Sequence, residues 1–282
     1  MALKLMYITN DLDVALIAQE YGVDRIWIDL ETLGKEKRQF GIDTVKSHHS
    51  VSDIVKIKPY LKQSELLVRI NPINTGSEKE IEDVISAGAD IIMLPYWKSV
   101  EEVKLFLGFV NGRCKTTLLL ETKEAVSIVD DVLNLSGIDE IHIGLNDLHL
   151  SYGLTFMFEL LTNGIVEQLC EKFKEKGLPY GFGGIAKIGE GLIPAEKIIL
   201  EHYRLGSTRA ILSRSFCDYT KMDIESVRRE FECNMVALRE FENAASIATD
   251  LSFITNRDDL VESVNHVVEY INSRKRGGEV IV

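Results

Sequence analysis

The stretch TTLLLETKEAVSIV, residues 116–129, decides the fold of this chain. Its first five residues predict a short buried strand, and the residues after Glu121 have the spacing of an amphipathic helix. Strand-then-helix units of this kind can be counted eight times, with strands expected at LKLMYI, RIWID, ELLVR, DIIMLP, TTLLL, EIHIG, YGFGG and RAILS. Short apolar strands separated by helices are typical of a parallel sheet buried on both faces. The pattern predicts an α/β protein, either a (β/α)8 TIM barrel or a doubly wound open sheet.

Helix signals fall between the strands and beyond the last one. Ser77 with Glu80, and Ser99 with Glu102, predict two capping boxes. Further helices are expected at about 124–134 and 165–176, and two more at 223–245 and 258–273, after the eighth strand. We therefore expect a barrel over residues 1–220 and additional C-terminal helices over 221–282. These helices would pack on the barrel or on a neighbouring subunit.

The composition is that of an ordinary globular protein, long enough at 282 residues for one barrel. A net charge of −12 argues against a nucleic-acid partner or an anionic membrane surface. No apolar run approaches the roughly 18 residues of a membrane span. The 4 cysteines are scattered, which suits reduced thiols in the cytosol. We expect a cytoplasmic protein that binds neither nucleic acid nor membrane.

Charged residues stand where several of the expected strands end. In a barrel, all strands point the same way, so their C-terminal ends converge on one mouth. Glu121 and Asp147 follow neighbouring strands, and Mg²⁺ typically takes one or two protein carboxylates while keeping waters and substrate oxygens as other ligands. Taken singly, Glu121 also suits a helix start and Asp147 a turn. Together they predict a divalent-cation site.

Arg69 ends the expected strand ELLVR, where a guanidinium must find a partner or water. Its fork of donors beside a cation site suits a carboxylate or phosphate. A salt bridge with Asp29 or Glu31 of the neighbouring strand is the structural alternative, and it is compatible with substrate binding. Because Asp29 and Glu31 alternate with apolar residues, both side chains face the same way.

The longest motifs resemble those of one family. They are GVDRIWIDLE at 22–31, LLVRINP at 66–72, GADIIMLP at 88–95, LLLETKEAV at 118–126 and IDEIHIGLNDLHLSYG at 138–153. In this order and spacing the chain resembles the HpcH/HpaI aldolase and citrate lyase family of the phosphoenolpyruvate/pyruvate-binding barrel superfamily. The resemblance extends from about Leu3 to Phe216.

This resemblance implies a (β/α)8 barrel enzyme with a metal cofactor. Glu121 and Asp147 would bind Mg²⁺ or Mn²⁺, and Arg69 would hold the oxygens of a pyruvate-like 2-oxo acid. In the family, the metal chelates the carboxylate and the 2-oxo group of the substrate. Removing a proton next to the carbonyl, or cleaving a bond to that carbon, leaves an enolate that a cation and an arginine stabilise.

The resemblance also assigns supporting roles. Asp29 and Glu31 would act with Arg69 in catalysis by orienting it and the metal-bound water. Backbone N–H groups near Gly144 and Asn146, or near Pro95, would complete the site for the substrate anion. A homo-oligomer, commonly a trimer or hexamer, is implied as well.

One position departs from the family pattern. Family aldolases that act on hydroxy-oxo-acids carry a histidine just after the strand-two acids, and this chain has Thr32 there. A threonine hydroxyl cannot serve as a base near neutral pH, so another group would be needed. The candidates are His48 and His49 in the loop after the second strand, and His149 beyond Asp147.

The citrate lyase branch lacks that histidine, and Lys35 and Arg38 after the acid pair loosely resemble its pattern. The sequence therefore predicts a divalent-metal-dependent carbon–carbon lyase, a class II type aldolase acting on a pyruvate or 2-oxo acid enolate. A citrate- or malyl-type acyl-CoA thioester lyase is the first alternative. A barrel that binds a 2-oxo acid without turnover is the second.

Overall fold

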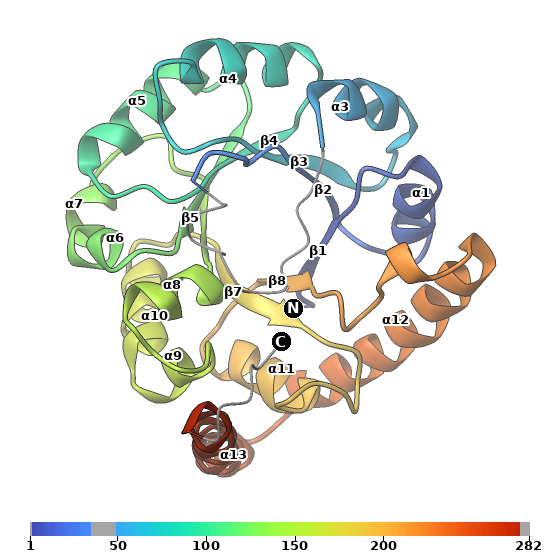
Figure 1. The fold of residues 1–282 in the computed structure, drawn as a ribbon, viewed down its shortest axis with the longest axis vertical. Helices are drawn as coiled ribbons and strands as arrows, with labels where there is room; N and C mark the ends of the chain where they lie inside the picture. The colour runs from blue at the N-terminus through green and yellow to red at the C-terminus, as the bar shows by residue number, and fades with distance from the viewer. Residues whose placement is uncertain (1, 35–48, 277–282) are drawn as a thin grey trace.

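A closed barrel of eight parallel strands forms the centre of the computed structural model, which describes residues 2–34 and 49–276. Each strand pairs with the next one along the chain, and β8 pairs with β1. Figure 1 shows this ring of strands with the helices arranged around it. The (β/α)8 prediction is confirmed, and the open-sheet alternative is wrong because the first and last strands are hydrogen-bonded.

The strands are short and the helices between them vary in length. The strands are β1 (Lys4–Ile8), β2 (Arg25–Asp29), β3 (Glu65–Arg69), β4 (Ile91–Leu94), β5 (Lys115–Leu120), β6 (Glu140–Ile143), β7 (Tyr180–Ile185) and β8 (Arg209–Leu212). The helices are α1 (Leu12–Glu20), α3 (Val51–Ile57), η1 (Lys58–Tyr60), α4 (Ser77–Ser86), α5 (Val100–Val110), α6 (Lys123–Ser127), α7 (Val129–Val132), α8 (Leu145–Ser151), α9 (Glu159–Thr162), α10 (Ile165–Glu175), α11 (Ala195–Arg204), η2 (Tyr219–Lys221), α12 (Ile224–Ser246) and α13 (Asp250–Arg276).

The helix predictions need three corrections. The single helix expected at 124–134 is split into α6 and α7. Two short helices, α8 and α9, precede α10, so Asp147 lies in the first turn of α8 and not in a turn between elements. The last helix begins at Asp250, earlier than residue 258.

One of the two expected capping boxes forms. The Ser99 hydroxyl accepts the N–H of Glu102 at 3.2 Å, and the Glu102 carboxylate accepts the N–H of Ser99 at 3.0 Å. The box predicted for Ser77 is wrong, because Ser77 is the first residue of α4 and not its cap. Its expected partner, Glu80, instead accepts two hydrogen bonds from Asn71, at 3.2 and 2.7 Å.

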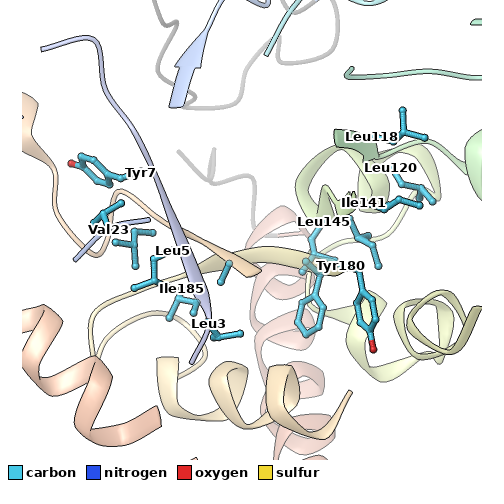
Figure 2. Packing of buried hydrophobic residues seen from close by; sticks show 14 of the residues in the cluster. Leu3, Leu5, Tyr7, Val23, Leu118, Leu120, Ile141, Leu145, Tyr180 and Ile185 are labelled. Carbon is cyan, nitrogen blue, oxygen red and sulfur yellow. The ribbon is translucent and has the colours of Figure 1, made fainter. Parts of the chain in front are cut away.

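Two separate groups of apolar side chains build the core. The larger one lies between the strands and the helices, and Figure 2 shows among its members Leu5 and Tyr7 of β1 and Leu3, which directly precedes that strand. The smaller one fills the inside of the barrel and comprises Met6, Trp27, Leu67, Ile91, Met93 and Leu119. Side chains of alternate residues therefore face opposite sides of the wall, as a closed barrel requires.

The first residues of several strands add a buried ionic layer inside the N-terminal end of the barrel. Glu140 accepts hydrogen bonds from Arg25 Nη2 at 3.0 Å, Arg209 Nε at 2.7 Å and Thr117 Oγ1 at 2.7 Å. Arg25 Nη1 also bonds to Glu140, and Arg25 Nε reaches Glu65 at 3.1 Å. Burial by itself raises the pKa of Glu140, but Arg25 and Arg209 outweigh this and hold it below its usual value.

The two long C-terminal helices pack on helices of the barrel (Figure 1). Helix α12 contacts α1 and α11, and α13 contacts α11 and α9. The Glu242 carboxylate of α12 accepts the N–H of Leu3 at 2.7 Å, next to the first strand. In the described part of the chain, no helix has the length and apolar character needed to cross a membrane.

Candidate active site

Arg69 and Asp29 close neighbouring strands at the C-terminal mouth of the barrel. The two residues are register partners of β3 and β2, which brings their side chains together. Arg69 donates to both carboxylate oxygens of Asp29, from Nε and from Nη2, each at 2.8 Å. Its Nη1 lies 3.3 Å from Glu31. The salt bridge considered from the sequence is thus present, and it involves both acids.

This clamp keeps Arg69 charged without using all of its donors. Burial alone lowers the pKa of Arg69, but the charges of Asp29 and Glu31 outweigh burial and raise it. A guanidinium has five N–H donors, and the clamp takes three of them. Its Cζ also lies 5.3 Å from the ring centroid of Trp27, which supports it from inside the barrel. By this count, two N–H groups of Arg69 do not take part in the clamp.

Glu121 follows β5 and is buried, with 3 % of its surface exposed. Its Oε1 accepts the backbone N–H of Tyr96 at 3.0 Å. Its Oε2 is packed against Gly144, where an added Cβ would lie 2.8 Å away. The charge of Glu121 also helps to raise the pKa of Arg69. The structure thereby brings Glu121, Arg69 and Gly144 to the same end of the barrel.

Helix α8 begins directly after Gly144, and its first turn contains Asn146 and Asp147. Asp147 is half-buried and Asn146 is exposed. The N–H of Gly144 donates to the carbonyl oxygen of Leu120 at 2.9 Å, which joins the ends of β6 and β5. The two metal-ligand candidates therefore follow adjacent strands. The roles of Gly144 and Asn146 toward a substrate remain predictions.

The donor set suits a hard cation. No group of three or more His, Cys, Asp or Glu side chains arranged to hold a metal occurs among residues 2–34 and 49–276. Mg²⁺ commonly takes only one or two protein carboxylates, and Glu121 and Asp147 are two carboxylates that follow adjacent strands. Gly144 leaves open the space beside Glu121 that a Cβ would fill. The residues fit Mg²⁺ or Mn²⁺, and ligation by this pair remains a prediction.

His49 enters the site in a way that the sequence does not reveal. Its Nδ1 accepts the backbone N–H of Asp29 at 2.9 Å. Because that nitrogen accepts, the proton of a neutral His49 ring is on Nε2. The ring is thus placed beside the acid clamp, with one nitrogen already engaged. Its position in a loop was the only sequence signal for it.

Thr32, at the family's histidine position, and the other candidate bases have different surroundings. Thr32 is exposed, and its hydroxyl donates to Oδ1 of Asn71 at 3.3 Å. The ring of His149 is buried and its Nδ1 lies 3.3 Å from the carbonyl oxygen of Leu145, and burial lowers its pKa. His48, Lys35 and Arg38 lie outside the described residues.

A comparison with protein-family models identifies the family. The model described as HpcH/HpaI aldolase/citrate lyase matches residues 5–159, which is more than half of the chain. This chain belongs to that family. Membership supports an enzyme of the aldolase and lyase type. A comparison with curated protein sequences finds no match.

Solved structures of similar fold have low sequence identity to this family member. One is an HpcH/HpaI aldolase from Desulfitobacterium hafniense DCB-2, with 15 % identity, a TM-score of 0.61 and coverage of 80 % of this chain and 93 % of that one. The citrate synthase SbnG has 16 % identity, a TM-score of 0.58 and coverage of 85 % and 94 %. Macrophomate synthase has 15 % identity, a TM-score of 0.54 and coverage of 75 % and 77 %. These likenesses show the shared barrel fold.

Proposed function

We propose that this protein is a divalent-metal-dependent carbon–carbon lyase of the class II aldolase type. It would cleave or form a bond to the enolate of pyruvate or a related 2-oxo acid. The proposal is carried by one observation: Asp29 and Glu31 hold Arg69 at the end of β3, and the buried carboxylate of Glu121 follows β5 at the same end of the barrel. An arginine and a candidate metal ligand thus lie at the same end of the barrel.

Arg69 would bind the substrate anion. Its two remaining N–H donors can hold a carboxylate or an enolate oxygen through charge-assisted hydrogen bonds. Asp29 and Glu31 would position the guanidinium, since together they engage all three of its nitrogens. Donors fixed before the reaction stabilise developing negative charge without a cost of reorganisation.

Glu121 and Asp147 would hold the metal cofactor, Mg²⁺ or Mn²⁺. When bound, the cation would supply charge stabilisation to the enolate oxygen. Glu121 is suited to this role because its carboxylate is already fixed by Tyr96 on one side and Gly144 on the other. The backbone of Gly144 and Asn146 would contact the substrate carboxylate.

A thioester lyase of the citrate or malyl type is the second candidate. Thr32 favours it, because the citrate lyase branch lacks the histidine that the hydroxy-oxo-acid aldolases carry at this position; here the Thr32 hydroxyl is exposed and donates to Asn71. A barrel that binds a 2-oxo acid without turnover is the third candidate.

Activity assays separate these three candidates. We expect pyruvate release or condensation when the protein is incubated with Mn²⁺, a hydroxy-oxo-acid or pyruvate, and a panel of simple aldehydes. Glu121→Ala should abolish turnover while the fold survives, and Glu101→Ala on the exposed face of α5 serves as the matched control. Cleavage of acyl-CoA substrates alone would favour the thioester lyase, and no turnover on either panel would favour the binding barrel.

We also propose that the protein is a cytoplasmic homo-oligomer, a trimer or hexamer. Exposed apolar residues on and between the C-terminal helices support an interface there, among them Val236, Ile247, Leu251 and Ile254. Light scattering after size-exclusion chromatography measures the mass directly. A monomer at micromolar concentration would contradict this part of the proposal.

A further inference from the structure

Tyr96, in the loop after β4, has an unusual backbone conformation. Its φ is +50°, in the left-handed region that residues other than glycine rarely adopt. One other described non-glycine residue has a positive φ, Asn111 at +48°. Asn111 is the C-cap of α5, where a left-handed asparagine is common. Tyr96 has no such helix-end explanation.

The strained conformation directs a backbone donor toward the candidate active site. The N–H of Tyr96 donates to Oε1 of Glu121 at 3.0 Å. On the other side, Oε2 of Glu121 lies where an added Cβ of Gly144 would come within 2.8 Å. The carboxylate is therefore held between the loop after β4 and the end of β6.

Neighbouring contacts force the loop to keep this shape. Trp97 is buried, with 1 % of its surface exposed, and its carbonyl oxygen accepts the Thr122 hydroxyl at 3.0 Å. Consecutive residues after β5 thus bind consecutive residues of the loop, Glu121 to Tyr96 and Thr122 to Trp97. The ring of Tyr96 is covered by the ammonium of Lys98, 4.6 Å from its centroid. Unfavourable backbone conformations persist where surrounding contacts determine them in this way, and they cluster at functional sites.

We propose that Tyr96 is a positioning residue whose left-handed backbone fixes the carboxylate of Glu121 for cation binding. This inference rests on the proposed function for its effect on the metal. The hydrogen bond that it invokes can be tested without any metal. Groups that hold a metal ligand from behind typically change metal affinity by about 10- to 100-fold when they are lost.

The direct test replaces one backbone N–H by an ester oxygen and leaves the side chain in place. Introducing the α-hydroxy acid of tyrosine at position 96 should weaken Mn²⁺ affinity at least about tenfold. The matched control is the same exchange at Asn111, whose N–H donates to Leu107 at 2.9 Å and which also has a positive φ. The control should lower the melting temperature and leave Mn²⁺ affinity as in the wild type. Wild-type Mn²⁺ affinity with the ester at position 96 would overturn the proposal.

Amide hydrogen exchange separates this inference from the proposed function. In the metal-free protein, the amide of Tyr96 should exchange at least about tenfold faster in Glu121→Ala than in the wild type, since the exchange rate follows the opening of its hydrogen bond. The amide of Asn111 should be unaffected. Unchanged exchange at Tyr96 would refute the positioning role, whatever the metal does. If the Tyr96 amide exchanges faster in Glu121→Ala but the wild type binds no Mn²⁺, the hydrogen bond is supported and the proposed metal function is refuted.

Discussion

At the N-terminal end of the barrel two arginines, Arg25 and Arg209, converge on Glu140, whereas at the C-terminal mouth two carboxylates, Asp29 and Glu31, converge on Arg69. The signs of the charges are reversed between the two clusters. At the N-terminal end all three guanidinium nitrogens of Arg25 bond to carboxylates, and its side chain is 1 % exposed.

The cluster at the C-terminal mouth, Arg69 with Asp29 and Glu31, is more accessible to solvent. The side chain of Arg69 is 12 % exposed, and the acids Glu121 and Asp147 follow β5 and β6 at the same end of the barrel. Each arginine has contacts through all three of its guanidinium nitrogens, so the two ends differ in exposure: Arg25 is shielded from solvent, and Arg69 is partly accessible. Under the proposed function, the accessible end would take the substrate anion and the cation. Ion pairs of the same residue types serve the fold at one end and suit binding at the other.

The largest expected difference between the two ends comes from the same substitution made at each. Glu140→Gln removes the charge that pairs with Arg209 and leaves Arg25 with Glu65 as its only carboxylate, so it should lower the free energy of unfolding by about 3–5 kcal/mol. Glu121→Gln keeps an acceptor for Tyr96 and should cost less than about 1 kcal/mol. Turnover should fall at least about 100-fold in Glu121→Gln, because a neutral amide is a poor ligand for Mg²⁺.

Urea unfolding and initial rates measure both effects, with Glu101→Gln on the surface as the control. The comparison fails if both variants lose equal stability. It also fails if Glu140→Gln is as stable as the wild type.

The stability of the fold should depend on pH through a buried histidine in the middle of the barrel. His142 lies two residues after Glu140 in β6. Burial lowers its pKa to about 4 from an ordinary value of 6.5. Between these two pH values the unfolded chain binds a proton at His142 and the folded chain does not. Stability should therefore be unaffected above pH 6.5 and fall as the pH decreases below it, by about 1.4 kcal/mol per pH unit.

His202 adds a loss of the same sign, because burial lowers its pKa to about 3. Glu140, with a pKa held below 4.5, contributes its own loss only below that pH. Unfolding free energies from pH 8 to 4.5 should therefore fall less steeply in His142→Gln than in the wild type. Identical slopes would show that His142 is not held neutral by burial.

The smallest chemical change is a single methyl group added at a glycine, and it should affect the two ends of the barrel differently. In Gly144→Ala the new Cβ would lie 2.8 Å from Oε2 of Glu121, so the carboxylate must shift. We expect Mn²⁺ affinity to fall about tenfold. Because the new Cβ would also lie 3.0 Å from the Cβ of Glu121, the melting temperature should fall as well, though less than in the next variant. In Gly181→Ala the Cβ would lie 2.3 Å from the backbone oxygen of Arg209, which cannot move easily. That variant should lose stability and keep its metal affinity when folded, and the reverse result would contradict the assignment of the two ends.

Much of the fold and the mouth could be predicted from the sequence for one physical reason. Parallel strands converge at their C-terminal ends, so Asp29, Arg69 and Glu121 had to lie near one another once the strands were recognised. The alternation of Asp29 and Glu31 predicted that both face the same way, and a salt bridge of Arg69 with one of them was the structural alternative; the structure shows contacts with both. Closure of the barrel depended on the family resemblance, because an open sheet has the same alternation of elements.

The remaining features depend on contacts between distant residues or on backbone geometry. Arg25 and Glu140 are 115 positions apart, and each looks like an unremarkable polar residue at a strand start. The placement of His49 beside Asp29 depends on the path of a loop. The left-handed φ of Tyr96 has no sequence signal, since such conformations usually mark glycine or asparagine.

The most direct test of the account is a calorimetric titration of Mn²⁺, with and without oxalate or pyruvate, in the wild type and in Glu121→Ala. We predict that the wild type binds Mn²⁺, that the oxo-acid or its analogue binds only when the metal is present, and that Glu121→Ala binds neither. Absence of Mn²⁺ binding by the wild type, or equal binding by Glu121→Ala, would contradict the proposed metal site and leave the non-catalytic barrel as the better description.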